Sequence, residues 1–221
     1  MTNGRKISIS ALPLGELAAN CYLVGKAGSN KVVCVDPGDE GEKILAFLQE
    51  NGLEVEAVLL THGHIDHIGA VDFVRKAFPE AYLGIEKEEA AMLADPEINL
   101  SCFYPALLTV SSPEKLFEDG EKFEAAGLEW TVIWTPGHTR GGACYLAKEI
   151  ESGEEALFTG DTLFLRSIGR TDLPTGDYPT LLESLKHKLM TLPAELVCYP
   201  GHGGATTIGR EAAENPYVDL C

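Results

Sequence analysis

The residues best suited to chemistry form a short run of histidines and one aspartate in the first third of the chain. Residues 61–67 read Thr-His-Gly-His-Ile-Asp-His and hold four potential metal ligands within six positions. The chain has six histidines, and three of them fall in this segment. Imidazole nitrogens and carboxylate oxygens without thiolates suit zinc, iron or manganese. The segment therefore predicts a metal centre rather than separate surface or packing histidines.

Three further candidate ligands, His138, Asp161 and His202, each follow an apolar run and a glycine. Glycine lets the backbone turn sharply where a strand gives way to a loop. Loops held by a rigid sheet often carry functional residues, and a metal site needs several such ligands in one place. We therefore expect four strand ends to bring their ligands to one edge of a sheet. His187 is the exception, because it lies inside an expected amphipathic helix and should face solvent.

The elements that must position these ligands are strands alternating with helices. Short runs of apolar and β-branched residues predict the strands, and apolar residues on one side of a helical repeat predict the helices. The expected strands are residues 7–12, 21–25, 31–35, 57–60, 82–85, 128–134, 156–159 and 195–199, and the expected helices are residues 42–51, 68–78, 86–94 and 178–189. Helices layered outside packed sheets would bury the apolar faces of both, so the pattern predicts an α/β fold.

The chain is long enough to bury a sizeable core. It has 221 residues, 45% of them hydrophobic, and no internal repeat, low-complexity tract or long linker divides it. A single domain over residues 1–221 is therefore expected. Residues 95–109 form an irregular stretch in which Phe103 and Tyr104 either cover a site or, as is commoner for loop aromatics, pack the loop itself.

Charge and hydropathy exclude several kinds of partner. The chain has 34 acidic and 17 basic residues, for a net charge of -17. Such a balance repels phosphate backbones and anionic lipids, so no nucleic-acid or membrane partner is expected. Residues 1–10 lack the apolar run of a signal peptide, and no later run reaches the length of a membrane span, so the expected location is cytoplasmic. The oligomeric state is left open.

The six cysteines are expected to be reduced thiols. Cys34, Cys144 and Cys198 lie in apolar runs typical of buried strands, where a free thiol behaves as a small hydrophobe. The chain has no Cys-x-x-Cys pair, which excludes a zinc knuckle or a thioredoxin-like motif.

The His-x-His-x-Asp-His string, followed by Gly-His, Gly-Asp and Gly-His, resembles the metallo-β-lactamase superfamily over nearly the whole chain. The resemblance implies a four-layer αββα sandwich with two divalent metal ions at its edge. Zinc is the expected metal, and iron or manganese is left open. On this pattern the first metal is held by His62, His64 and His138, the second by Asp66, His67 and His202, and Asp161 bridges both.

Two close divalent ions suggest the mechanism. Together they would lower the pKa of a shared water toward neutrality, and one of them would polarise a substrate carbonyl. Asp66 is the expected catalytic residue, because it is both a ligand and able to accept a hydrogen bond that orients the nucleophile.

Residues 135–139, 159–164 and 167–172 resemble the glyoxalase II branch of the superfamily. That branch hydrolyses the thioester of a 2-hydroxyacylglutathione to glutathione and a 2-hydroxy acid, so the expected substrate is a small anionic thioester. Arg170 falls where the branch has a basic residue for the glutathione carboxylate, and it is the expected substrate-binding residue. The alternative is that Arg170 only pairs with Asp172 or another carboxylate.

Two features depart from the larger glyoxalase II enzymes. The chain ends soon after His202, without their helical C-terminal glutathione-binding extension, and Asp172 replaces a tyrosine. The length is more similar to that of the short bacterial and archaeal glyoxalase II-like subgroup.

Two parts of the sequence bear on other activities of the same fold. The Gly-Arg-Thr-Asp string also resembles persulfide dioxygenases, which use one iron at the equivalents of His62, His138 and Asp161, and this is the main alternative. β-Lactam hydrolysis is not expected, given the absent signal peptide and the Asp66-His67 pair. Nucleic-acid processing is not expected for so acidic a chain.

Overall fold

Two six-stranded sheets pack face to face in the computed structural model, which describes residue 4 and residues 6–218. The first sheet has the order β1-β2-β3-β4-β5-β6. Strands β3 to β6 run parallel to one another, while β1 and β2 pair antiparallel. Its strands are β1 (Ile7–Leu14), β2 (Ala19–Lys26), β3 (Lys31–Val35), β4 (Glu54–Leu60), β5 (Tyr82–Glu86) and β6 (Lys115–Phe117).

The second sheet has the order β14-β13-β10-β9-β8-β7. All its pairs are antiparallel except β10 with β13. Its strands are β7 (Lys122–Ala125), β8 (Leu128–Trp134), β9 (Ala143–Lys148), β10 (Glu155–Gly160), β13 (Val197–Pro200) and β14 (Thr206–Thr207). A separate two-stranded ribbon consists of β11 (Leu163–Phe164) and β12 (Ser167–Ile168).

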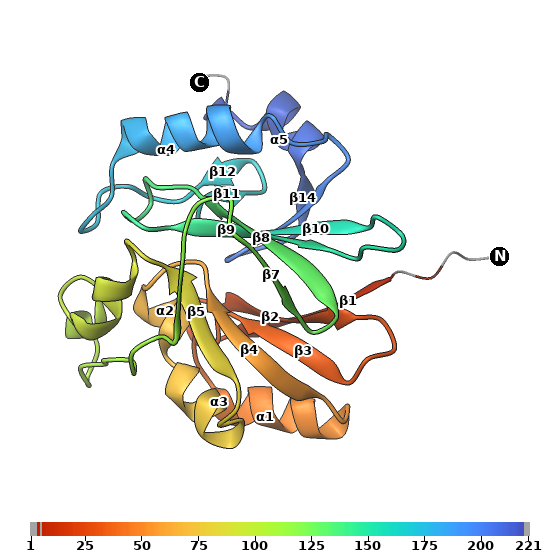
Figure 1. The fold of residues 1–221 in the computed structure, drawn as a ribbon. Coiled ribbons are helices and arrows are strands. Elements are labelled where there is room, and N and C mark those ends of the chain that lie inside the picture. The colour runs from red at the N-terminus through yellow and green to blue at the C-terminus, as the bar shows by residue number, and fades with distance from the viewer. Residues whose placement is uncertain (1–3, 5, 219–221) are drawn as a thin grey trace.

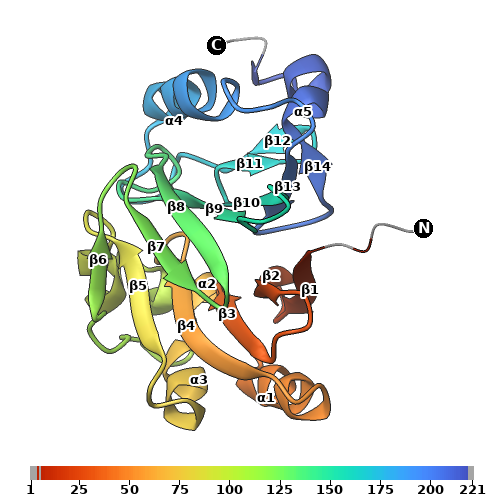
Figure 2. The same cartoon turned by 45° about the vertical axis from the view of Figure 1, so that its right-hand side comes forward.

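Helices cover the outer face of each sheet (Figures 1 and 2). On the first sheet lie α1 (Gly41–Glu50) and α3 (Val71–Ala77), and on the second lie α4 (Tyr178–Ser184) and α5 (Ile208–Glu214). The short helix α2 (Ile65–Ile68) follows β4 after the four residues 61–64. The expected αββα sandwich is confirmed, because the two sheets form the inner layers and the helices the outer ones.

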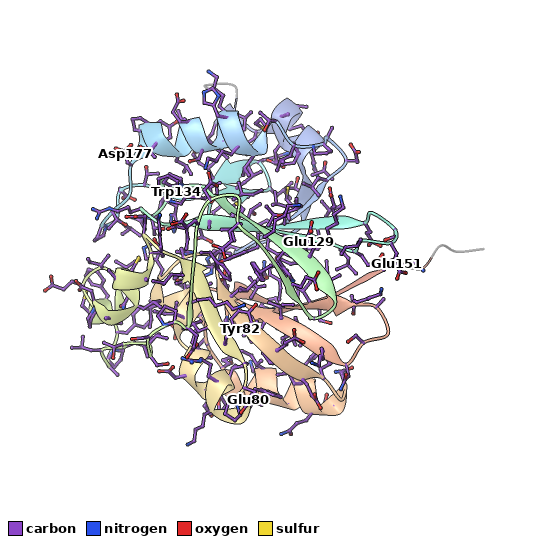
Figure 3. All side chains as sticks on the ribbon, in the orientation of Figure 1. Glu80, Tyr82, Glu129, Trp134, Glu151 and Asp177 are labelled. Carbon is purple, nitrogen blue, oxygen red and sulfur yellow. The ribbon has the colours of Figure 1, made fainter. Side chains whose placement is uncertain are left out.

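The core between the sheets is apolar. Side chains from both sheets occupy the space between them (Figure 3). Its largest members include Trp130 and Tyr145 from the second sheet and Phe117 from the first, all fully buried. The indole of Trp130 stacks on Phe123, and the Tyr145 hydroxyl donates across the interface to the Leu60 carbonyl at 2.9 Å. This hydrogen bond ties the second sheet to the end of β4, where the histidine-rich segment begins.

The structure corrects two of the expected helices. The expected helix at 68–78 is divided into α2 and α3 around Gly69 and Ala70. The expected helix at 86–94 is wrong: β5 continues through Glu86, and only a 3-10 turn at Ala90–Ala94 follows. The Glu86 carboxylate accepts the Glu88 backbone N–H at 2.7 Å, which closes a turn there in place of a helix.

The last expected helix is present, while several short strands were not expected. The last expected helix is present as α4 followed by a π-helical turn at Leu185–Leu189, and His187 is exposed and pairs with Glu183 as expected for a solvent-facing residue. The short strands β6, β7 and β14 were not predicted. β9 was indicated only by the apolar run around Cys144.

Five cysteines are described as free thiols, and four of them are buried. Cys221 and most of residues 1–5 lie outside the described residues, so the expectations about the last thiol and the amino terminus are not addressed. No helix in the described part of the chain is both long and apolar enough to cross a membrane.

Replacing Trp130 with alanine should sharply destabilise the fold. The side chain is fully buried between the sheets, so its loss leaves a cavity and should reduce the free energy of unfolding by about 3–5 kcal/mol. Urea denaturation followed by circular dichroism measures this. Leu116→Ala, at an exposed apolar position, is the control and should change stability by less than about 0.5 kcal/mol. Equal effects of the two substitutions would contradict the central place of Trp130.

Candidate metal centre

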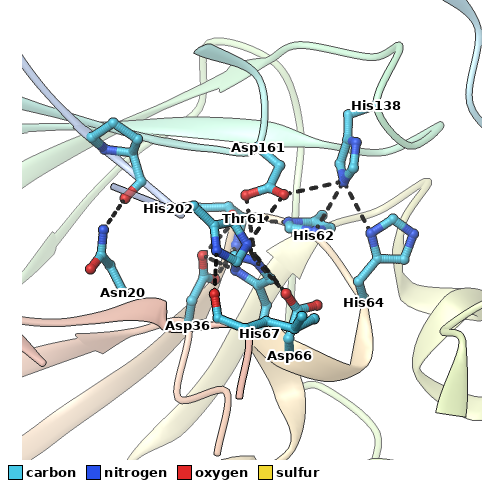
Figure 4. A network of polar contacts seen from close by, with 12 residues as sticks. Asn20, Asp36, Thr61, His62, His64, Asp66, His67, His138, Asp161 and His202 are labelled. Atoms are coloured by element: carbon cyan, nitrogen blue, oxygen red, sulfur yellow. Dashed lines mark hydrogen bonds and ion pairs between the residues drawn. The ribbon is translucent and has the colours of Figure 1, made fainter. Parts of the chain in front are cut away.

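The seven predicted ligand residues meet at one edge of the sandwich (Figure 4). The His62-to-His67 segment follows β4 of the first sheet. His138 follows β8, Asp161 follows β10 and His202 follows β13, all in the second sheet. Strand ends from both sheets therefore supply the site, and the loops after them aim the side chains toward one another.

The first group consists of His62, His64 and His138, all buried. The Nε2 atoms of His62 and His138 are 3.3 Å apart, and the His64 Nδ1 atom lies 3.0 Å from the same His138 nitrogen. The potential ligand atoms of the group lie within 4.8 Å of one another. Three imidazole nitrogens therefore converge on a space of the size that one metal ion needs.

The second group consists of Asp66, His67 and His202. The His202 Nε2 atom lies 3.2 Å from Asp66 Oδ2 and 3.4 Å from His67 Nε2. Asp66 Oδ2 is also 3.7 Å from His67 Nε2. This group offers one carboxylate and two imidazoles, again converging from different loops.

Asp161 lies between the two groups (Figure 4). Its Oδ2 atom is 3.7 Å from His138 Nε2 in the first group and 3.6 Å from His202 Nε2 in the second. Its Oδ1 atom is 3.4 Å from His67 Nε2, is buried, and has no hydrogen-bond partner among the described residues. A buried carboxylate oxygen without a donor is costly unless a cation lies beside it. The residues present thus fit two divalent ions that share Asp161.

The two groups differ in their electrostatics. In the first, burial lowers the pKa of His62 and His138 and lowers the pKa of His64 to about 3. These imidazoles are therefore neutral, with nitrogen lone pairs available to a metal.

In the second group, the negative charges of carboxylates have the larger effect on the histidine pKa. Burial lowers the pKa of His67, but the negative charges of Asp66 and Asp161 and the hydrogen bond to Asp36 outweigh it and raise this pKa to about 10. Burial also raises the pKa of Asp66, but the neighbouring His67 and His202 outweigh that effect and hold the pKa of this carboxyl well below its usual range. This side of the site is therefore built to hold positive charge.

Asp36 was not predicted as a site residue, although it lies at the base of the site. Its Oδ2 atom faces His67 Nδ1 at 3.0 Å, and its two oxygens also accept the Thr61 backbone N–H and hydroxyl at 2.7 and 2.6 Å. The carboxylate thereby turns His67 so that Nε2 faces Asp161. The only sequence signal is an aspartate directly after the apolar strand β3, which runs beside β4.

Glu89 was also missed, because residues 86–94 were expected to be a helix. Its buried carboxylate accepts the Gly63 backbone N–H at 2.9 Å and the Gly141 backbone N–H at 2.7 Å. Gly63 separates His62 from His64, and Gly141 lies three residues after His138. One side chain therefore joins the two loops that carry the first group of ligands.

The His202 loop is held by the β1–β2 hairpin. The His202 Nδ1 atom faces the Leu17 carbonyl at 3.1 Å, which directs Nε2 into the site. The buried Asn20 amide donates to the carbonyls of Pro200 and Gly203, both at 3.0 Å. Both contacts join the first sheet to the second.

A cleft of about 600 Å³ opens over the site. Arg170 lines it, and its guanidinium also makes two hydrogen bonds to Asp172, at 2.7 and 2.8 Å. The carboxylate partner expected under the alternative for Arg170 is thus present, and substrate binding by Arg170 stays a prediction. Phe103 and Tyr104 line the same cleft, and Phe103 is 80% exposed, so packing of the loop is not the use of that ring.

The sequence is similar to proteins that are named as hydrolases or probable metallo-hydrolases. The family model of the metallo-beta-lactamase superfamily matches residues 14–202. A relative named probable metallo-hydrolase M6_Spy0554, from Streptococcus pyogenes serotype M6, is 37% identical over 200 residues, covering 89% of this chain and 83% of the relative. Hydroxyacylglutathione hydrolase GloC from Haemophilus influenzae is 32% identical over 214 residues, covering 96% of this chain and 99% of that protein.

Solved structures agree in fold. The BLEG-1 B3 metallo-beta-lactamase is 36% identical, with a TM-score of 0.88 over 96% of this chain and 99% of that one. TTHA1623 in a di-iron-bound form is 35% identical, with a TM-score of 0.81 over 94% and 99%. ETHE1 from Myxococcus xanthus is 29% identical, with a TM-score of 0.74 over 95% and 83%. Shared sequence, fold and convergent histidines and aspartates lead to one conclusion: this chain belongs to the metallo-β-lactamase superfamily.

Proposed function

We propose that this metallo-hydrolase binds two divalent metal ions and cleaves S-(2-hydroxyacyl)glutathione to glutathione and a 2-hydroxy acid. The observation that carries the proposal is the position of Asp161 between two complete ligand groups on the floor of a cleft. The 32% identity to a hydroxyacylglutathione hydrolase over nearly the full length of both chains supports the choice of substrate.

Each ligand residue has a place in this chemistry. His62, His64 and His138 would hold the first ion, Asp66, His67 and His202 the second, and Asp161 both. Bound ions would supply a water of near-neutral pKa and polarise the substrate carbonyl. Asp66 lines the cleft, and a carboxylate there can accept a hydrogen bond from the attacking water and orient it. A thiolate leaves readily, so no separate general acid is required.

The metal itself is proposed to be zinc or iron. The nitrogen and oxygen ligands accept both, and the 35%-identical TTHA1623 is described in a di-iron-bound form. The anionic substrate, the cytoplasmic location, the single domain and the lack of nucleic-acid or membrane partners stay predictions from the sequence.

The main alternative is a persulfide dioxygenase with a single iron at His62, His138 and Asp161. The likeness to ETHE1 at 29% identity is compatible with it. Against it stands the second group, since Asp66, His67 and His202 also converge within ligand distance of one another. Metal analysis separates the two: one iron per chain with oxygen uptake favours the dioxygenase, and two metals favour the hydrolase.

Purified, metal-loaded protein should release free thiol from S-D-lactoylglutathione. His62→Ala and Asp161→Ala should abolish this turnover and reduce bound metal, because each removes a proposed ligand. His187→Ala is the matched control, since that histidine is exposed on a distant helix. Thiol release is followed with a chromogenic disulfide, and metal is measured by mass spectrometry. Full metal content and full rate in either ligand variant would refute the assignment, and negligible wild-type turnover with two bound metals would refute the substrate.

Replacing Arg170 and replacing Asp172 with alanine should change the Michaelis constant KM in opposite directions. If the guanidinium contacts the glutathione carboxylate, Arg170→Ala should raise KM by about twofold to fivefold, the size expected of an exposed charge contact, with a smaller change in kcat. Asp172→Ala removes the competing carboxylate, so KM should fall. Steady-state kinetics on the same thioester measures both. An unchanged KM in both variants would show that Arg170 serves only the ion pair.

Glu89→Gln should weaken metal binding at the first group. A carboxylate accepts both glycine N–H groups, whereas an amide presents an NH₂ group to one of them, so the two loops should separate. We expect bound metal to fall from two ions toward one, and activity to fall about tenfold or more. Excess metal ion should restore part of the activity. Glu88→Gln, on the exposed neighbouring residue, is the control, and equal metal content in both variants would exclude a positioning role for Glu89.

A further inference from the structure

A second cleft of about 830 Å³ lies beside the second ligand group. It shares five lining residues with the cleft over the metal centre, so the two clefts adjoin. These shared residues are Leu17, Ile65, Asp66, Phe103 and Tyr104. Asp66 is a proposed ligand, so a group in the second cleft lies directly next to the reacting centre.

The second cleft has an exposed apolar wall. Phe103 is 80% exposed, Leu107 is 69% exposed and Leu17 is 55% exposed. Phe103 ends the 3-10 turn at Ser101–Phe103, and Leu107 belongs to the loop that follows it. Leu17, in the β1–β2 hairpin, lines the same cleft. Three large apolar side chains that line one cleft gain free energy when a ligand removes them from water.

The charges around this wall are unfavourable to an anion. No lysine or arginine is among the lining residues of the second cleft, whereas Glu16, Asp39 and Asp66 are. Arg170 lines only the cleft over the metal centre. An anionic substrate group would therefore turn toward Arg170, and an uncharged apolar group would enter the second cleft.

The hairpin side of the wall is joined to the metal centre by hydrogen bonds. The Leu17 carbonyl faces His202 Nδ1 at 3.1 Å, so the hairpin that carries the Leu17 side chain also orients a proposed ligand. Asn20, on the same hairpin, holds the His202 loop through Pro200 and Gly203. These contacts set the position of the Leu17 hairpin relative to the reacting centre.

We propose that the second cleft is the acyl subsite and that it takes an uncharged apolar substituent on the 2-hydroxyacyl group. The preferred substrates are then thioesters of 2-hydroxy acids with an aromatic or branched side chain, and not of lactate. This inference rests on the proposed thioesterase function and adds to it the class of acyl group.

The test compares S-D-mandeloylglutathione with S-D-lactoylglutathione, which differ only in a phenyl against a methyl group. Phe103→Ala and Leu107→Ala should each lower kcat/KM for the mandeloyl substrate by about fivefold or more, since an apolar contact is lost. Leu107 lines only the second cleft, so Leu107→Ala should leave kcat/KM for the lactoyl substrate within about twofold. Ile150→Ala, an exposed apolar residue in a different loop, should change neither. An unchanged ratio of the two substrates in both cleft variants would overturn the proposal.

A binding measurement separates failure of this inference from failure of the proposed function. Calorimetry should show that metal-loaded protein binds D-mandelate about fivefold or more tightly than D-lactate, and that Phe103→Ala removes the difference. If neither thioester is turned over but this binding pattern holds, the glutathione thioesterase function fails and the apolar subsite stands. If mandelate binds no more tightly than lactate, the proposed apolar subsite is refuted, even if the protein hydrolyses lactoylglutathione.

Discussion

The distance between the two sheets is the constraint on which the site depends. The first sheet supplies His62, His64, Asp66 and His67, while the second supplies His138, Asp161 and His202. Neither ligand group is complete without a residue from the other sheet, and Asp161 must reach both groups at once. The apolar core between the sheets, built around Trp130, therefore sets the geometry of the metal centre as well as the stability of the fold.

Hydrogen bonds near the site reinforce this inter-sheet packing. Tyr145 of the second sheet donates to the Leu60 carbonyl of the first, and Tyr22 of the first donates to the Pro200 carbonyl of the second at 2.6 Å. Glu89 joins the loops after β4 and β8, and Asn20 holds the loop after β13. Each contact is buried or partly buried, where a lost partner is costly, so the loops that carry the ligands have little freedom to separate.

The two clefts beside the metal centre differ in charge and polarity. Arg170 lines the cleft over the metal centre and is already paired with Asp172. Its guanidinium lowers the pKa of Asp172 to about 2. The apolar wall with Phe103 lines the second cleft, together with carboxylates. In a chain with a net charge of -17, one partly neutralised arginine gives only modest attraction for an anion. Under the proposed function, apolar contact near the second ligand group would be the stronger source of selectivity.

The sequence by itself determined the fold class and the side chains that gather at the site. Ligand-bearing loops after apolar strands, with a glycine before His138, Asp161 and His202, are local patterns, and local patterns survive into the folded structure. Only the tertiary structure decided which residues support them. Asp36 and Glu89 act through partners 25 to 52 residues away, and Phe103 is exposed because of the cleft it lines. The short strand β6, which pairs with β5 about 31 residues earlier, and the absent helix at 86–94 likewise depend on long-range pairing and burial, which override local propensity.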